Sequence, residues 1–186
     1  MSPMIRLPLA VEHCLLGFLR ERPMHGYEIH QRLADPAGLA SVWRLKQSQL
    51  YAVLSRLEEE GYITARLQPQ DTRPPRRVFR LTKTGREAFL VWVKNPVLHG
   101  RQIRLEFLVK LYFARQEGAG VAAQLIRRQQ TTCRDWLAGQ QAQADKIGQA
   151  NPYEWLVCQF RLGQIEASLT WLDQCEAVLV QTTPSR

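Results

Sequence analysis

One stretch decides the fold: Ser48-Gln49-Leu50-Tyr51-Ala52-Val53-Leu54-Ser55-Arg56-Leu57-Glu58-Glu59-Glu60-Gly61-Tyr62-Ile63. Its aliphatic residues recur at i, i+3, i+4 and i+7, which predicts a helix with one buried face. We expect this helix to begin at Gln47 or Ser48 and to end at Glu60, because Gly61 stops it. The opposite face shows Ser48, Ala52, Ser55 and Glu59, flanked by Gln49, Tyr51 and Arg56. Its short, polar first turn suits close approach to base edges in a major groove.

The residues after this helix predict a β-hairpin. Residues 62–67 are rich in strand formers, a polar tip with three prolines follows, and residues 77–81 form a second strand. Four arginines lie at or next to the tip: Arg73, Arg76, Arg77 and Arg80. Such residues suit contact with sugar-phosphate or a minor groove. A solvated basic loop is the alternative for the hairpin alone, but the adjacent helix favours nucleic-acid binding.

Three further helices complete the first half of the chain. The patterns predict helices over residues 9–21, 26–34 and 83–93, with Thr82 as the N-cap of the last one. The order helix, helix, helix, hairpin, helix is the plan of a winged helix-turn-helix, in which the third helix reads DNA and the hairpin is the wing. The predicted class is therefore mainly α with a small β-hairpin wing, joined to an α-helical dimerisation domain.

Four segments resemble the PadR-like transcription regulators. They are Leu15-Leu16-Gly17-Phe18-Leu19, Arg22-Pro23-Met24-His25-Gly26-Tyr27-Glu28-Ile29, the opening stretch from Ser48 to Ile63, and Pro75-Arg76-Arg77-Val78-Phe79-Arg80-Leu81-Thr82-Lys83-Thr84-Gly85. A further segment resembles the longer subgroup of that family: Glu106-Phe107-Leu108-Val109-Lys110-Leu111-Tyr112-Phe113. The resemblance implies a homodimer on a roughly palindromic double-stranded operator, often a repressor that a small molecule releases.

The resemblance and the residue pattern together give a set of candidate DNA contacts. These are Tyr27, Lys46, Ser48, Gln49, Tyr51, Arg56, Arg73, Arg76 and Arg77. Gln49 stands where the family often has a small residue or threonine, which leaves the operator sequence open. Two of these residues have an alternative role to DNA contact. Tyr51 could equally pack against the protein, and Arg56 could form an ion pair with Glu59 or Glu60.

The second half is predicted to be helical. We place the DNA-binding domain at residues 1–95 and a dimerisation and possible effector domain at residues 96–186, with helices over 101–115, 119–147 and 152–180. The last helix is long, apolar and poor in charge, so a second copy of the chain is its expected partner. The tryptophans Trp92, Trp136, Trp155 and Trp171 suggest a pocket for a small aromatic effector, with core packing as the favoured alternative for each.

Composition and the motifs present also bear on which other classes of protein are compatible with the sequence. The formal charge is +8, and residues 1–95 carry 15 Lys/Arg against 9 Asp/Glu, a balance of +6. No signal peptide or membrane-length apolar run is evident, so we expect a cytoplasmic protein with reduced cysteines. We find no phosphate loop, metal-ligand spacing or nucleophile elbow, so neither an enzyme nor a cofactor is expected. A winged-helix adaptor that contacts proteins and a cysteine redox switch are the remaining alternatives.

Overall fold

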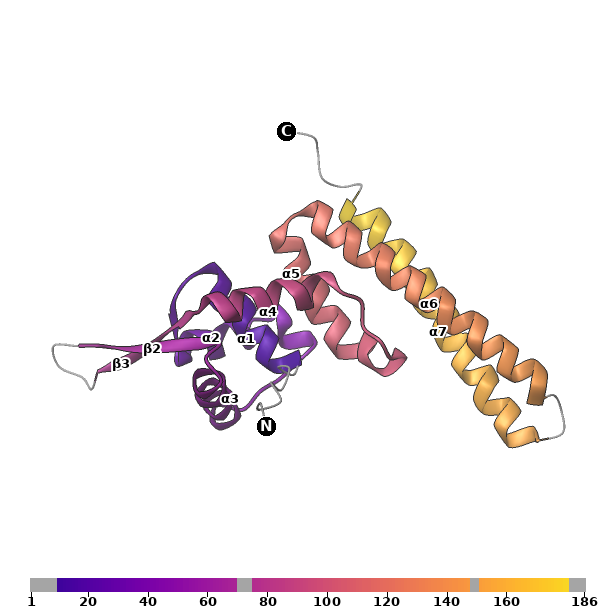
Figure 1. Ribbon diagram of the computed structural model, residues 1–186, viewed down its shortest axis with the longest axis horizontal. Coiled ribbons are helices and arrows are strands. Elements are labelled where there is room, and N and C mark those ends of the chain that lie inside the picture. Colours follow the sequence, from indigo (N-terminus) through magenta and orange to yellow (C-terminus); the bar gives the residue numbers. More distant parts are fainter. Residues whose placement is uncertain (1–9, 70–74, 148–150, 181–186) are drawn as a thin grey trace, which may run out of the picture. The chain divides into compact units, whose positions relative to one another are not determined.

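The computed structural model describes residues 10–69, 75–147 and 151–180, and most of them are helical (Figure 1). The contacts divide the chain into two compact units, Met1–Val93 and Lys94–Arg186. The helices and strands of the first unit follow the predicted order. They are α1 (Ala10–Glu21), β1 (Met24–His25), α2 (Gly26–Leu33), the 3₁₀ turn η1 (Leu39–Ser41), α3 (Gln47–Glu59), β2 (Ile63–Gln68), β3 (Arg76–Leu81) and α4 (Lys83–Lys94). The fold-class prediction is confirmed.

Helix α1 is the central helix of the first unit. All its residues from position 12 to 19 are buried, so it has contacts on every side rather than along one stripe. The apolar stripe predicted for α3 enters the same core, and Leu50, Leu54 and Leu57 are fully buried. Two backbone bonds close the end of α3, Gly61 N–H to the Glu58 carbonyl and Tyr62 N–H to the Leu57 carbonyl. Gly61 has φ 76°, the left-handed conformation that this helix end requires.

The hairpin belongs to a three-stranded antiparallel sheet of order β1-β3-β2. Figure 1 shows β2 and β3 extending away from the helices of their unit. Strand β1 has only two residues and was not predicted, because so short a strand has no periodicity to detect. The Thr82 hydroxyl accepts the Gly85 N–H at 3.0 Å, which confirms the predicted N-cap of α4. Gly85 itself is required, since a Cβ there would lie 2.1 Å from the Tyr62 carbonyl oxygen.

The second unit contains η2 (Gly100–Gln102), a π-helical turn η3 (Ile103–Phe107), α5 (Leu108–Glu117), α6 (Ala119–Ile147) and α7 (Pro152–Val180). Helices α6 and α7 lie side by side and antiparallel (Figure 1). Arg127 near the start of α6 pairs with Glu176 near the end of α7, at 3.0 Å. None of the described helices combines the length and the apolar character needed to cross a membrane.

Polar side chains of α5 and α6 hold the first residues of the second unit in place. The Gln129 amide is fully buried and bonds both the N–H and the carbonyl of Val97. The Lys110 ammonium donates to the Asn95 carbonyl at 2.9 Å, and Arg128 donates to the Lys94 carbonyl at 3.0 Å. The segment from Lys94 to Val97 is therefore fastened into its unit by hydrogen bonds rather than left as a flexible linker.

Two of the four tryptophans considered for the effector pocket, Trp92 and Trp171, pack inside separate units. Trp92 stacks on the buried His13 ring, with centroids 4.8 Å apart, and Trp171 meets Phe107 edge-on at 5.9 Å. These contacts fit the alternative interpretation of the two tryptophans, in which they pack in the core instead of lining an effector pocket. The four cysteines are buried and free, as expected. Burial raises the pKa of Cys14 and Cys133, and raises that of Cys175 to about 11.

Candidate nucleic-acid interface

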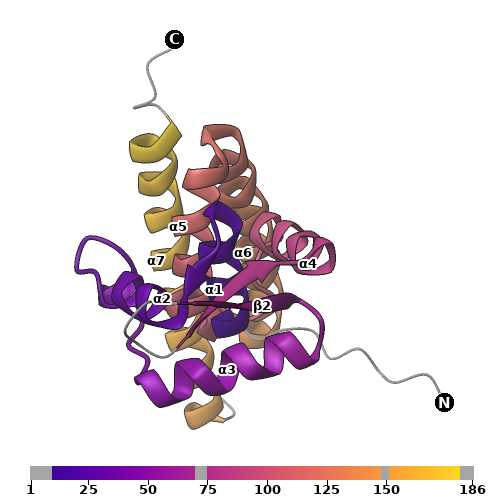
Figure 2. The same ribbon diagram turned by 90° about the vertical axis from the view of Figure 1, so that its left-hand side faces the viewer.

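Helix α3 presents a polar face to solvent at the outer side of the first unit (Figure 2). The exposed side chains are Gln47, Ser48, Gln49, Tyr51, Ala52, Ser55 and Glu59. Its first turn holds no acidic residue, so nothing there repels a phosphate backbone. We call α3 the reader helix, since a helix with a free polar N-terminal turn has the chemistry that contacts base edges.

Gln49 has a second role in the reader helix. Its side-chain oxygen accepts the backbone N–H of Lys46 at 3.1 Å, which caps the start of the helix. The bond fixes the direction of the amide and leaves its NH₂ group as a donor. Lys46 immediately precedes the helix and is exposed. The two residues therefore offer a directed donor and a cation at one helix end.

Tyr51 both packs and stays accessible. Its ring lies against the backbone of Gly26, so that a Cβ at Gly26 would be only 2.6 Å from the ring. The same side chain remains 41% exposed, so packing leaves it accessible, and its contact with DNA stays a prediction. Tyr27, the next residue on α2, is 59% exposed. Gly26 thus allows α2 and α3 to approach closely while each displays one tyrosine.

Arg56 forms an ion pair that the sequence did not suggest. Its guanidinium contacts the carboxylate of Glu12 on α1, a side chain only 1% exposed, instead of Glu59 or Glu60. Glu12 lies in the first turn of α1 and is buried there, where a charge is costly unless it is paired. Arg56 therefore fastens the reader helix to the central helix. As a DNA contact it stays a prediction, with its guanidinium already engaged.

The hairpin separates its arginines onto two faces. Cross-strand pairing joins Arg66 with Val78, Thr64 with Arg80 and Gln68 with Arg76. Because side chains alternate along a strand, Arg66, Arg76 and Arg80 share one face, and all three are exposed. Phe79 and Ile63 are buried on the other face. We call the exposed triplet the wing arginine face.

Arg77 points to the other face and contacts the protein. Its guanidinium pairs with Glu58 of the reader helix and lies 5.3 Å from the centre of the Phe79 ring. The Glu58 carboxylate also accepts the backbone N–H of Ala65 at 3.2 Å. Glu58 of the reader helix therefore bonds the backbone of β2 and the Arg77 side chain of β3, and Arg77 acts as a brace.

A polar cluster at the base of the wing contacts Arg76. The Arg76 guanidinium lies 3.4 Å from Nε2 of His25, whose other ring nitrogen faces the carboxylate of Glu28. Arg22 donates to the same carboxylate at 3.0 Å. Burial raises the pKa of Glu28, but the hydrogen bonds from His25 and Arg22 and their charges outweigh it, so the pKa is lowered. His25 thus links the start of α2 to a member of the wing arginine face.

Most of the predicted contact residues come together on one part of the unit. Tyr27, Lys46, Ser48, Gln49, Tyr51 and Arg76 are all exposed on α2, on the reader helix or just before it, or on the wing. Arg73 lies outside the described residues. Sequence reasoning missed Arg66, whose place beside Arg76 follows from strand register, and it missed the supporting residues Glu12 and Glu58.

This arrangement defines a winged helix-turn-helix protein of the DNA-binding class: a reader helix with a free polar turn, braced to an arginine-bearing hairpin. Residues 15–90 match the model of the transcriptional regulator PadR-like family, and residues 103–180 match the model named virulence activator alpha C-term. These matches confirm the resemblance to the PadR-like transcriptional regulators that the sequence predicted.

Relatives match over nearly the whole length. The negative transcriptional regulator PadR of Bacillus subtilis is 25% identical over 178 residues, which cover 91% of this chain and 97% of that protein. A probable transcriptional regulator of Mycobacterium tuberculosis is 24% identical, over 92% of this chain and 98% of its own. Among solved structures, Bacillus subtilis PadR in complex with operator DNA is 25% identical, with a TM-score of 0.47 over 92% of this chain and 99% of that one.

Proposed function

We propose that this chain represses transcription by binding a specific operator as a homodimer. The observation that carries the proposal is the exposed first turn of the reader helix, braced to the wing through Glu58 and Arg77. In this proposal Ser48 and the Gln49 amide read base edges, and Tyr27 and Lys46 flank them; the exposure of all four side chains supports these roles. The wing arginine face, with Arg73 as a further predicted member, supplies the contacts to phosphate that hold the register.

The proposed dimer surface lies on α7. One side of this helix packs on α6 through Cys158 and Leu162. Another side leaves Leu156 and Phe160 largely exposed, at 58% and 66%. Apolar residues on two sides of one helix need two partner surfaces, and a second copy supplies the missing one. Replacing Phe160 by Glu is expected to convert the dimer to a monomer in light scattering, while Gln124→Glu, at an exposed position of α6, leaves it dimeric.

Repression and release complete the proposal. The Bacillus subtilis relative is named a negative regulator, which supports repression, and we propose that a small molecule lowers operator affinity as the family resemblance implies. The protein would act in the cytoplasm, where its DNA lies, without catalysing a reaction. The match to the model of a regulator family supports this non-enzymatic role.

The test is a footprint on the DNA upstream of the protein's own gene. We expect one protected, roughly palindromic site, and we expect Gln49→Ala combined with Arg76→Gln to abolish it. The matched control Gln124→Ala with Arg134→Gln, both exposed on α6, should leave the footprint intact. Binding that is weak, sensitive to salt and blind to sequence would refute operator recognition and would favour the adaptor alternative.

A further inference from the structure

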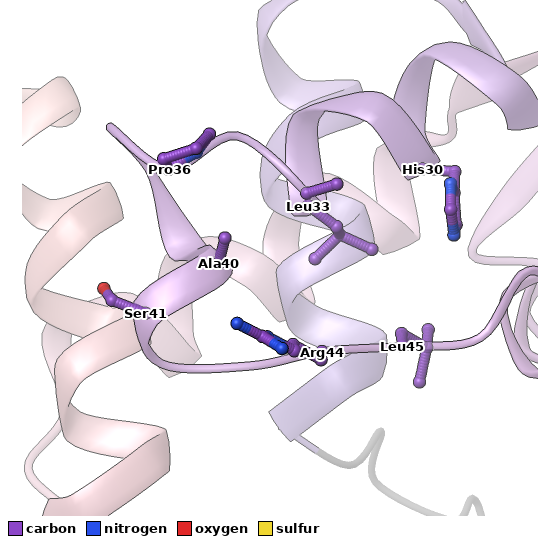
Figure 3. Close-up of a pocket in the computed structure, with 8 residues that line it drawn as sticks. His30, Leu33, Pro36, Ala40, Ser41, Arg44 and Leu45 are labelled. Atoms are coloured by element: carbon purple, nitrogen blue, oxygen red, sulfur yellow. The ribbon is translucent and has the colours of Figure 1, made fainter.

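The first unit contains a hollow beside the start of the reader helix. It has a volume of about 530 Å³ and lies between the C-terminal half of α2 and the segment that leads from α2 to α3 (Figure 3). Its lining residues are His30, Leu33, Ala34, Pro36, Ala40, Ser41, Arg44 and Leu45. Cavities of this size hold small organic molecules. None of the residues assigned to DNA contact lines it.

The hollow combines an aliphatic wall with positive charge. Leu33, Pro36 and Leu45 supply apolar surface, and Arg44 and His30 supply donors, while no carboxylate is among the lining residues. The Arg44 guanidinium makes no ion pair or hydrogen bond with any residue that the structure describes, in contrast to Arg56 and Arg77. An unused guanidinium beside an aliphatic wall complements a molecule with a carboxylate at one end and an apolar body.

Hydrogen bonds shape the segment around the hollow before any ligand arrives. The Ala37 N–H bonds the Asp35 carboxylate at 2.9 Å, and the Trp43 N–H bonds the Leu39 carbonyl at 2.8 Å. Leu39 is buried in the core and anchors the middle of the segment. A preformed wall lowers the ordering cost of binding, so the hollow is suited to ligands of modest size.

The wall of the hollow leads directly into the reader helix. Arg44 and Leu45 precede Lys46, whose N–H is bonded by Gln49 at the helix start. A ligand that draws Arg44 into the hollow therefore acts on the backbone that sets this cap. Its single negative charge also neutralises the Arg44 cation beside the turn that approaches DNA phosphates, so bound ligand and bound DNA oppose each other.

We propose that this hollow is an effector site for a small organic carboxylate with an apolar body, and that its occupation weakens DNA binding. The coupling to DNA rests on the proposed function, whereas ligand binding in the hollow does not. The probe is octanoate, with 1-octanol as the matched uncharged molecule. Binding is followed on the full-length protein by amide chemical shifts, and operator affinity by fluorescence anisotropy with and without octanoate.

We expect octanoate to saturate with a Kd on the order of 1 mM, as ten non-hydrogen atoms allow, with shifts centred on residues 30–46. Octanol should bind at least about tenfold more weakly, since it lacks the group that pairs with Arg44. Arg44→Gln should weaken octanoate about tenfold, and Ala40→Phe should block it by filling the hollow. Arg161→Gln, an exposed arginine on α7, is the control and should change nothing. Octanoate should lower operator affinity about fivefold or more in the wild type only.

Several results would overturn the proposal. Chemical-shift changes that do not saturate by ~20 mM octanoate, well above the expected Kd, would show that the hollow is not a binding site. Shifts that persist in both Arg44→Gln and Ala40→Phe would place the ligand elsewhere. Weaker DNA binding by Arg44→Gln without ligand, together with unchanged octanoate binding, would make Arg44 a DNA contact instead. Failure of the ligand-free protein to footprint would refute the proposed function while the chemical-shift result still decides the site.

Discussion

Arg76 and Arg77 are adjacent in sequence, yet the structure gives them different tasks. Arg76 is exposed on the wing arginine face, while Arg77 pairs with Glu58 of the reader helix. We therefore expect Arg76→Gln to weaken DNA binding at every sequence alike and to leave the free energy of unfolding unchanged. Arg77→Gln should instead reduce stability slightly and alter the salt dependence of DNA binding little.

The magnitudes follow from exposure and from the number of phosphate contacts. A lost phosphate contact lowers the slope of log affinity against log salt by about 0.9, so a dimer that loses Arg76 from both wings should lose about 1.8. The exposed position of Arg76 limits its effect on stability to about 0.5 kcal/mol. The Arg77–Glu58 pair is 47% and 31% exposed, so its removal is expected to cost less than about 1 kcal/mol of unfolding free energy.

The assay is anisotropy on the operator and on a scrambled duplex at four salt concentrations, with urea unfolding of each variant. Arg161→Gln on α7 is the control for loss of one exposed arginine. An unchanged salt slope in Arg76→Gln, or equal slopes in the Arg76 and Arg77 variants, would refute the assignment of the two residues to opposite faces. Loss of discrimination between the duplexes in Arg76→Gln would show base reading instead of phosphate contact.

Three further predictions test the supports of the site. Gly85→Ala should lower the unfolding free energy, measured in urea, by about 2–4 kcal/mol. The added methyl group would overlap the Tyr62 carbonyl and displace the hydrogen bond that the Thr82 hydroxyl donates to it. A variant as stable as the wild type would contradict this prediction. Arg56→Gln should cost about 2–3 kcal/mol, since it removes the partner of the buried Glu12 carboxylate, and the salt slope should hardly move. A thiol reagent at pH 8 should label no cysteine of the folded protein, because all four are buried and burial raises the pKa of Cys175 to about 11. Rapid labelling with loss of DNA binding would instead support a redox switch.

The local patterns predicted the elements of the fold closely. The apolar residues at i, i+3, i+4 and i+7 located the reader helix within one residue, and Gly61 marked its end as predicted. The prolines and strand formers located the hairpin, and Thr82 capped the next helix as predicted. These signals are readable because helix periodicity, caps and turns depend on residues within a few positions of one another.

Contacts between distant segments had no such signal. Glu12 reads as a solvent-facing residue until tertiary packing buries it against Arg56, 44 positions along the chain. Arg66 joins Arg76 only through the register of two strands, and a slip of one residue would reverse its face. The sequence by itself determined which segments form helices and strands and which family the chain resembles. Only the tertiary structure decided which arginines remain available for DNA and which hold the protein together, because burial and pairing depend on what other segments bring to each side chain.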